Sequence, residues 1–264
     1  MISSVIIILQ EVLEAMLLIS ILMASSSAIG LNQKWLPAAL LTGLAGAVVY
    51  ALFFERVSMM FEGFGQEYFY SAMMLGIAIL LGIWNLCLVY FIRRKGLLLP
   101  RPLLLGLLLM TVSLAMMHEG AEIYLYGYAY GVAANSIGTI FSGGAIGAGI
   151  GISVGTFIYY GLRALQPINC LRVGSVVLTL VSAGMILQAS LRLTQADVLP
   201  AQMPLWDSSF LISENSIVGE LFYALLGYEA TPTPLQVMIY GSSLFLMIML
   251  MVLVHRTAGK RESQ

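Results

Sequence analysis

Residues 5–19 read VIIILQEVLEAMLLI, a long apolar run that holds two glutamates, Glu11 and Glu14. Residues 112–126 read VSLAMMHEGAEIYLY and repeat the same spacing with Glu119 and Glu122. Positions i and i+3 share one face of a helix, so each pair forms an acidic patch. A carboxylate in the hydrocarbon core of a bilayer costs at least about 2.5 kcal/mol. The two matched pairs therefore predict a cation site inside a membrane; the alternative is protonated glutamates that hydrogen-bond between helices.

The composition is that of an integral membrane protein. Of the 264 residues 60% are hydrophobic and 9% are charged, and the mean hydropathy is +0.95. Soluble domains carry roughly 25% charged residues, so a soluble fold is excluded. Cys87 and Cys170 are far apart and form neither a disulfide framework nor a CxxC motif.

Seven apolar runs are long enough to cross a bilayer, which takes about 20 residues in a helix. We therefore expect an all-α integral membrane protein with seven transmembrane helices in a single transmembrane domain, residues 1–264. The sizeable loops are expected at 55–69 and 193–235. The helices are expected at about 3–24, 35–54, 70–91, 103–126, 140–161, 172–192 and 236–255.

The charged residues predict the orientation. Basic residues mark the cytoplasmic side of membrane proteins, which places the N-terminus outside and the C-terminus in the cytoplasm. The membrane is expected to be a bacterial inner (plasma) membrane. Most of the acids outside the helices fall on the outer side, where they would attract cations. Arg56 and Arg192 fall outside, and ten basic residues fall inside: Lys34, Arg93, Arg94, Lys95, Arg101, Arg163, Arg172, Arg256, Lys260 and Arg261.

Helices 1 and 4 cross in opposite directions in this topology, which explains why the glutamate motif occurs twice. We expect a 3+3 inverted repeat with halves at about 1–91 and 103–192, followed by an outer loop and a last helix in 193–255. Inverted repeats place the substrate site near the midplane, between the halves. The fifth helix also carries glycines at 143, 147, 151 and 155, a ladder that predicts close packing against helix 1 or helix 4.

Oxygen ligands favour hard cations such as iron and manganese over softer ions. Glu11, Glu14, Glu119 and Glu122 are the predicted metal ligands. His118 and Gln10, at corresponding positions of the two motifs, either bind the ion, support its ligands, or simply pack between helices. Three acids of the long outer loop are candidates to capture ions before they reach the membrane site, the alternative being an ordinary solvated loop: Asp207, Glu214 and Glu229.

The paired motif resembles that of the oxidase-dependent high-affinity iron permeases, whose first and fourth helices each carry Arg-Glu-Gly-Leu-Glu. The glutamates of both motifs match, and so does Gly120. The family arginines are replaced by Gln10 and His118, and Val12 replaces the first glycine. The resemblance covers nearly the whole chain, and its C-terminal part rests on Trp206-Asp207-Ser208, Gly219, Gly227-Tyr228, Pro232 and Tyr240.

The resemblance implies a permease, not an enzyme, that imports ferric iron delivered by an oxidase or by a periplasmic iron-binding protein. Iron would be the transported substrate, with no permanently bound cofactor and no nucleic-acid partner. Ferrous iron or manganese is the first alternative. A membrane di-iron oxidase would need Glu-x-x-His motifs, whereas this chain has only His118 and His255. A proton-coupled carrier of an organic cation, in which the glutamates relay protons, is the third class.

Overall fold

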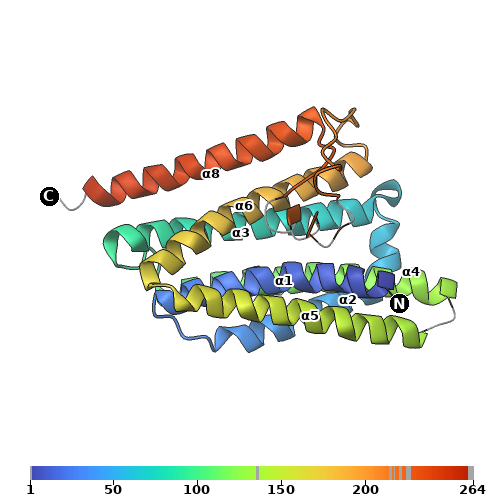
Figure 1. The fold of residues 1–264 in the computed structure, drawn as a ribbon, viewed down its shortest axis with the longest axis horizontal. Helices are drawn as coiled ribbons and strands as arrows, with labels where there is room; N and C mark the ends of the chain where they lie inside the picture. The colour runs from blue at the N-terminus through green and yellow to red at the C-terminus, as the bar shows by residue number, and fades with distance from the viewer. Residues whose placement is uncertain are drawn as a thin grey trace.

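The computed structural model describes residues 2–134, 137–213, 216, 218–219, 222–223 and 227–260. These residues form seven long helices and no strand, and every helix is long and apolar enough to cross a membrane. The prediction of an all-α membrane protein with seven spanning helices is confirmed (Figure 1). The helices are α1 (Ile2–Ala28), α2 (Trp35–Ser58), α3 (Gly65–Arg94), α4 (Arg101–Ala134), α5 (Ile137–Ala164), α6 (Pro167–Gln195) and α8 (Pro234–Lys260).

The helices extend several residues beyond the apolar runs. In lipid each backbone N–H and C=O must be bonded within its own helix, and these bonds continue into the polar ends. α2 runs through Glu55 and Arg56 to Ser58, and α3 begins at Gly65. The loop expected at 55–69 is therefore wrong in extent: a short turn that contains the 3-10 helix η1 (Phe61–Gly63) replaces it.

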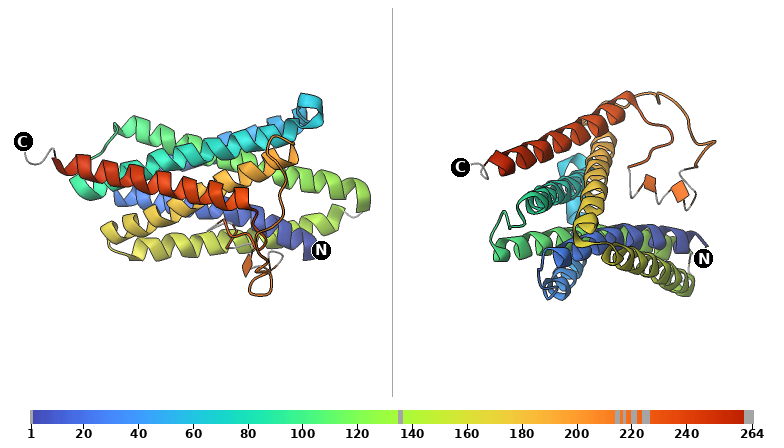
Figure 2. Two further views of the ribbon diagram at one scale, coloured as in Figure 1. Left: turned by 90° about the horizontal axis from the view of Figure 1, so that it is seen from above. Right: turned by 60° about the vertical axis from the view of Figure 1, so that its left-hand side comes forward.

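Two helix pairs form the body of the bundle. α1 packs along α5, α4 packs along α2, and α1 crosses α4 between these pairs. α3 packs against α6, and α8 lies on the outer side of both (Figure 2). In the expected inverted repeat, helix 1 would match helix 4 and helix 2 would match helix 5, so the α1–α5 pair would match the α4–α2 pair. The inverted repeat itself stays a prediction.

Glycines hold both helix pairs at close range. A Cβ at Gly155 of α5 would lie 2.6 Å from the Cβ of Met16 on α1, and one at Gly151 would lie 2.9 Å from Val12. A Cβ at Gly120 of α4 would lie 2.7 Å from the Cβ of Ala47 on α2. Since real side chains do not tolerate such distances, only glycine permits these approaches. The predicted packing of the glycine ladder against α1 is confirmed.

The hydrophobic core fills one half of the bundle, on the side of the basic loops. It draws buried residues from α1 to α6, and four of its fully buried side chains are Leu17 of α1, Leu81 of α3, Leu108 of α4 and Leu178 of α6. On α1 the core begins immediately after Glu14. The glutamates therefore lie where the packed apolar half of the bundle gives way to its more polar half.

The segment between α6 and α8 folds over the acidic end of the bundle. The backbone N–H groups of Leu205 and Ser208 donate to the carbonyls of Pro232 and Ala230, at 2.8 Å in each case. Gly227 has a φ of +66° and lies against the backbone of Gly184 on α6, where a side chain would not fit. The two hydrogen bonds fold the segment back on itself, and the Gly227–Gly184 contact attaches it to α6.

Candidate cation site

The two glutamate pairs meet between α1 and α4. Glu11, Glu14 and Glu119 are buried, and Glu122 is partly exposed. The Glu11 carboxyl lies beside the Glu119 carboxyl, and Glu14 lies near Glu122 and His118. Glu11 is nine residues from the start of α1, about 14 Å along a helix, which is close to the middle of a bilayer. The structure thus brings together the four glutamates that the sequence singled out.

His118 lies within this cluster. Its Nδ1 atom is 3.4 Å from Oε1 of Glu119, and its Nε2 atom is 3.7 Å from Oε1 of Glu122. The ring packs edge-on against Tyr70 of α3, with the ring centroids 5.4 Å apart. His118 therefore both packs between helices and faces two of the glutamates, so the two roles weighed for it are not exclusive.

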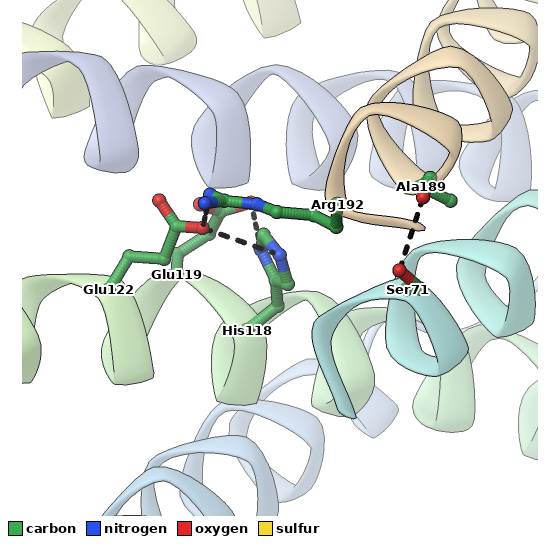
Figure 3. A network of polar contacts seen from close by, with 6 residues as sticks. All are labelled: Ser71, His118, Glu119, Glu122, Ala189 and Arg192. Atoms are coloured by element: carbon green, nitrogen blue, oxygen red, sulfur yellow. Dashed lines mark hydrogen bonds and ion pairs between the residues drawn. The ribbon is translucent and has the colours of Figure 1, made fainter. Parts of the chain in front are cut away.

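Arg192 of α6 supplies a positive charge to the site. Its guanidinium donates to Oε1 of Glu122 at 2.6 Å and lies over the ring of Tyr70, 5.5 Å from the centroid. Figure 3 shows the side chain extending from the end of α6 across to Glu122, above His118. Ser71 of α3 donates to the carbonyl of Ala189 at 3.1 Å and fixes this turn of α6 beside α3. The sequence places Arg192 among the outer loop charges; in the structure it reaches back into the bundle.

Two amide side chains complete the surroundings of Glu14. Gln10 lies one turn before it on α1, and Gln188 lies one turn before Arg192 on α6; both interact with the Glu14 carboxyl. Gln188 is buried. An amide can donate hydrogen bonds to a carboxylate or offer its oxygen to a cation, so Gln10 and Gln188 can serve the site in either state.

Several polar atoms of the site have no hydrogen-bond partner. Both carboxyl oxygens of Glu119 and both ring nitrogens of His118 are buried and make no hydrogen bond, although His118 lies 3.4 Å from Glu119 and 3.7 Å from Glu122. Buried polar atoms are nearly always bonded, and exceptions point to a missing ion or water. As the side chains stand, no three His, Cys, Asp or Glu residues in the described ranges are arranged to hold one metal ion. Glu122 in particular is engaged by Arg192, so a metal ion would require side-chain rearrangement.

The structure describes two of the three proposed outer capture residues. Asp207 is exposed, and its carboxylate accepts hydrogen bonds from the backbone and the hydroxyl of Ser209, which hold the pKa of Asp207 below its ordinary value. Glu229 lines a cavity of about 400 Å³ together with Trp206 and Tyr228. Glu214 lies outside the described residues. The outer residues on which the family resemblance rests therefore meet in part, since Gly227, Pro232 and Tyr240 line the same cavity.

Sequence reasoning missed Arg192, Gln188 and Tyr70 as neighbours of the glutamates. Gln188 carried a usable signal, because a polar amide in the middle of an apolar helix tends to face the bundle interior. Tyr70 carried none, since aromatic residues near the start of a spanning helix are common. Tyr223 of the outer segment is also near: burial, followed by the charges of Glu14 and Glu229, raises its pKa.

Comparison of the chain with models of protein families, with curated proteins and with solved structures finds no match among any of the three.

Proposed function

We propose that this seven-helix membrane protein is a permease that imports iron through a site formed by Glu11, Glu14, Glu119 and Glu122. One observation carries the proposal: two glutamate pairs from different helices converge inside the bundle, and the buried oxygens of Glu119 there make no hydrogen bond. Carboxylate oxygens suit hard cations, and an ion shared by four of them would offset their mutual repulsion.

The charge at the site gives Arg192 a role in this proposal. With no ion bound, its guanidinium pairs with Glu122 at 2.6 Å. It thus supplies, from α6, a positive charge that the resembling family carries within its two motifs, where this chain has Gln10 and His118. An arriving metal ion would displace Arg192 from Glu122 and then draw the four carboxylates together.

The burial pattern supports access from the acidic end of the bundle. The side chains of Arg192 and Glu122 are 33% and 20% exposed, whereas the hydrophobic core beyond Glu14 is buried. The split of basic residues makes the acidic end extracytoplasmic. The proposal is therefore uptake from outside, in a bacterial inner membrane, of ferric iron presented by an oxidase or a periplasmic iron-binding protein.

The test is uptake into proteoliposomes that contain the purified chain. Ferric citrate, Fe(II), Mn(II), Cu(I) and Zn(II) are offered separately, so that the same assay distinguishes iron from another divalent ion. We expect saturable iron uptake that the double substitution Glu11→Gln/Glu119→Gln abolishes. The control is Glu55→Gln/Glu62→Gln, the same chemical change at two exposed glutamates, one in the last turn of α2 and one in η1. Full uptake by the first variant would refute the proposed site.

A further inference from the structure

A second feature of the bundle is a cavity of about 480 Å³ between α1, α2, α4 and α5. Glu11 and Glu119 line it, and Tyr124 is the other polar side chain in its wall. The remaining lining residues are apolar or glycine and include Met16 and Met116. The site described above therefore has two different sides: Arg192, Gln188 and Glu122 on one, and this apolar chamber on the other.

The cavity opens on the flank of the bundle that faces lipid. Three rim residues are about half exposed, Leu44 at 56% and Val48 at 53% on α2 and Ile152 at 49% on α5. All three lie within spanning helices, so their exposed surface faces the hydrocarbon region of the bilayer. A molecule dissolved in the membrane can reach Glu11 and Glu119 between α2 and α5 without crossing the polar end of the bundle.

No basic side chain lines this chamber; His118, which lies outside it, approaches Glu119 Oε1 with its Nδ1 atom at 3.4 Å. Glu119 is 2% exposed, and both its oxygens lack a hydrogen-bond partner. No lysine or arginine lines the chamber, and Arg192 is engaged with Glu122 instead. A buried charge in apolar surroundings is strongly stabilised by a counter-ion. The chamber thus combines two carboxyl groups, which a bound cation would stabilise in their charged form, with walls that are otherwise mainly apolar.

These properties select a class of ligand. A hydrated metal ion would find only two carboxyl groups and one phenol oxygen in walls that are otherwise apolar, whereas a lipophilic organic cation is weakly hydrated and gains apolar contact. The volume falls in the range of about 300–1,000 Å³ that holds drug-sized ligands. Tyr124 and the methionines add favourable contacts for cationic and aromatic groups.

We propose that the chamber binds a lipophilic organic cation from the bilayer, with Glu11 and Glu119 as its counter-charges. Such a ligand occupies two of the four glutamates, so it competes with any metal ion at the neighbouring site. This binding activity goes beyond the proposed iron transport and does not depend on it.

The test is equilibrium binding of radiolabelled tetraphenylphosphonium to the purified chain in nanodiscs, without metal. Tetraphenylborate, which has nearly the same size and shape but the opposite charge, reports simple partition into lipid. We expect saturable binding of one tetraphenylphosphonium per chain, at least tenfold weaker in Glu11→Gln/Glu119→Gln, and no saturable binding of tetraphenylborate. Equal behaviour of the two ions, or binding unaffected by this variant, would overturn the proposal.

A second variant closes the rim and leaves the carboxyl groups intact. Val48→Trp places a large ring at the opening, and Leu41→Trp is its matched control on an exposed position of α2 that does not line the chamber. We expect Val48→Trp to weaken tetraphenylphosphonium binding severalfold and Leu41→Trp to leave it unchanged; equal binding by both would refute access through the flank. Since no iron is present, a negative result here leaves the transport proposal standing, and a failure of iron uptake leaves this one standing.

Discussion

Replacement of Arg192 by glutamine tests whether this side chain competes with the transported ion. A hydrogen bond to a charged group contributes roughly 1.5–3 kcal/mol. The Arg192–Glu122 pair is partly exposed, so solvent screening reduces its strength and the lower end of that range applies. An ion that must displace Arg192 bears this cost. Since about 1.4 kcal/mol corresponds to a factor of ten in affinity, Arg192→Gln should lower the half-saturating iron concentration about tenfold.

The measurement is iron uptake into proteoliposomes over a range of iron concentrations. Arg192→Lys keeps a positive charge but loses the planar fork of the guanidinium, so its half-saturating concentration should fall between those of the wild type and Arg192→Gln. Arg56→Gln is the matched control, because Arg56 lies over the ring of Phe53 at 5.7 Å, on the surface of α2 and away from the glutamates. Its half-saturating concentration should equal that of the wild type.

The opposite result would refute the reasoning. If Arg192 positions Glu122 for the ion, its loss leaves that carboxylate misplaced, and the half-saturating concentration rises. An unchanged value would show that the ion pair at 2.6 Å does not oppose binding. The apparent thermal unfolding temperature without metal provides a separate check, since Arg192→Gln should lower it and the added substitution Glu122→Gln should restore part of the loss.

Three further predictions follow from the packing and the proposed topology. Gly151→Leu should lower iron uptake and the apparent unfolding temperature, because overpacking costs about 1–3 kcal/mol. Gly149→Leu is its control, because a side chain there meets open space; equal uptake and unfolding temperature in the two variants would refute close packing of α5 on α1. Cysteine introduced at Ser208 in a cysteine-free background should react with an impermeant thiol reagent in intact spheroplasts, and labelling only after lysis would reverse the topology. Neutralising Asp207 and Glu229 together should raise the half-saturating iron concentration at low ionic strength, where screening is weak; no change would leave them as ordinary solvated residues.

The sequence predicted the helices and the meeting of the glutamate pairs because both depend on strong local signals. A run of some 20 apolar residues must be helical in lipid, and carboxylates within it must turn away from lipid. The glycine ladder of α5 likewise predicted close packing against one of two helices. The corresponding close packing of α2 on α4 was not predicted, although Gly43 and Gly46 take part in it. Two glycines among many apolar residues are a weak signal for a helix contact.

The position of Arg192 could not be read from the chain. It lies in the last turn of α6, where a basic residue normally faces water. Arginine has a long side chain that can run back along apolar surface and place its charge several ångströms from its own Cα. Whether it turns outward or inward depends on what the neighbouring helices present, here Tyr70 and Glu122. The direction of this side chain is therefore decided by the tertiary structure and not by the local sequence.

Two glycine seams, the close contacts of α1 with α5 and of α2 with α4, bear on which parts of the bundle can move. α1 packs on α5 and α4 packs on α2 so closely that a Cβ at the facing glycines would clash, so we expect each pair to move as one unit. Glu11 and Glu14 belong to the first unit, and Glu119 and Glu122 belong to the second. The four carboxylates are thus divided between two bodies that meet face to face, and an ion held by all four would clamp those bodies together. Its release to either side would require the two units to separate at the α1–α4 contact, because the glycine contacts within each unit are closer.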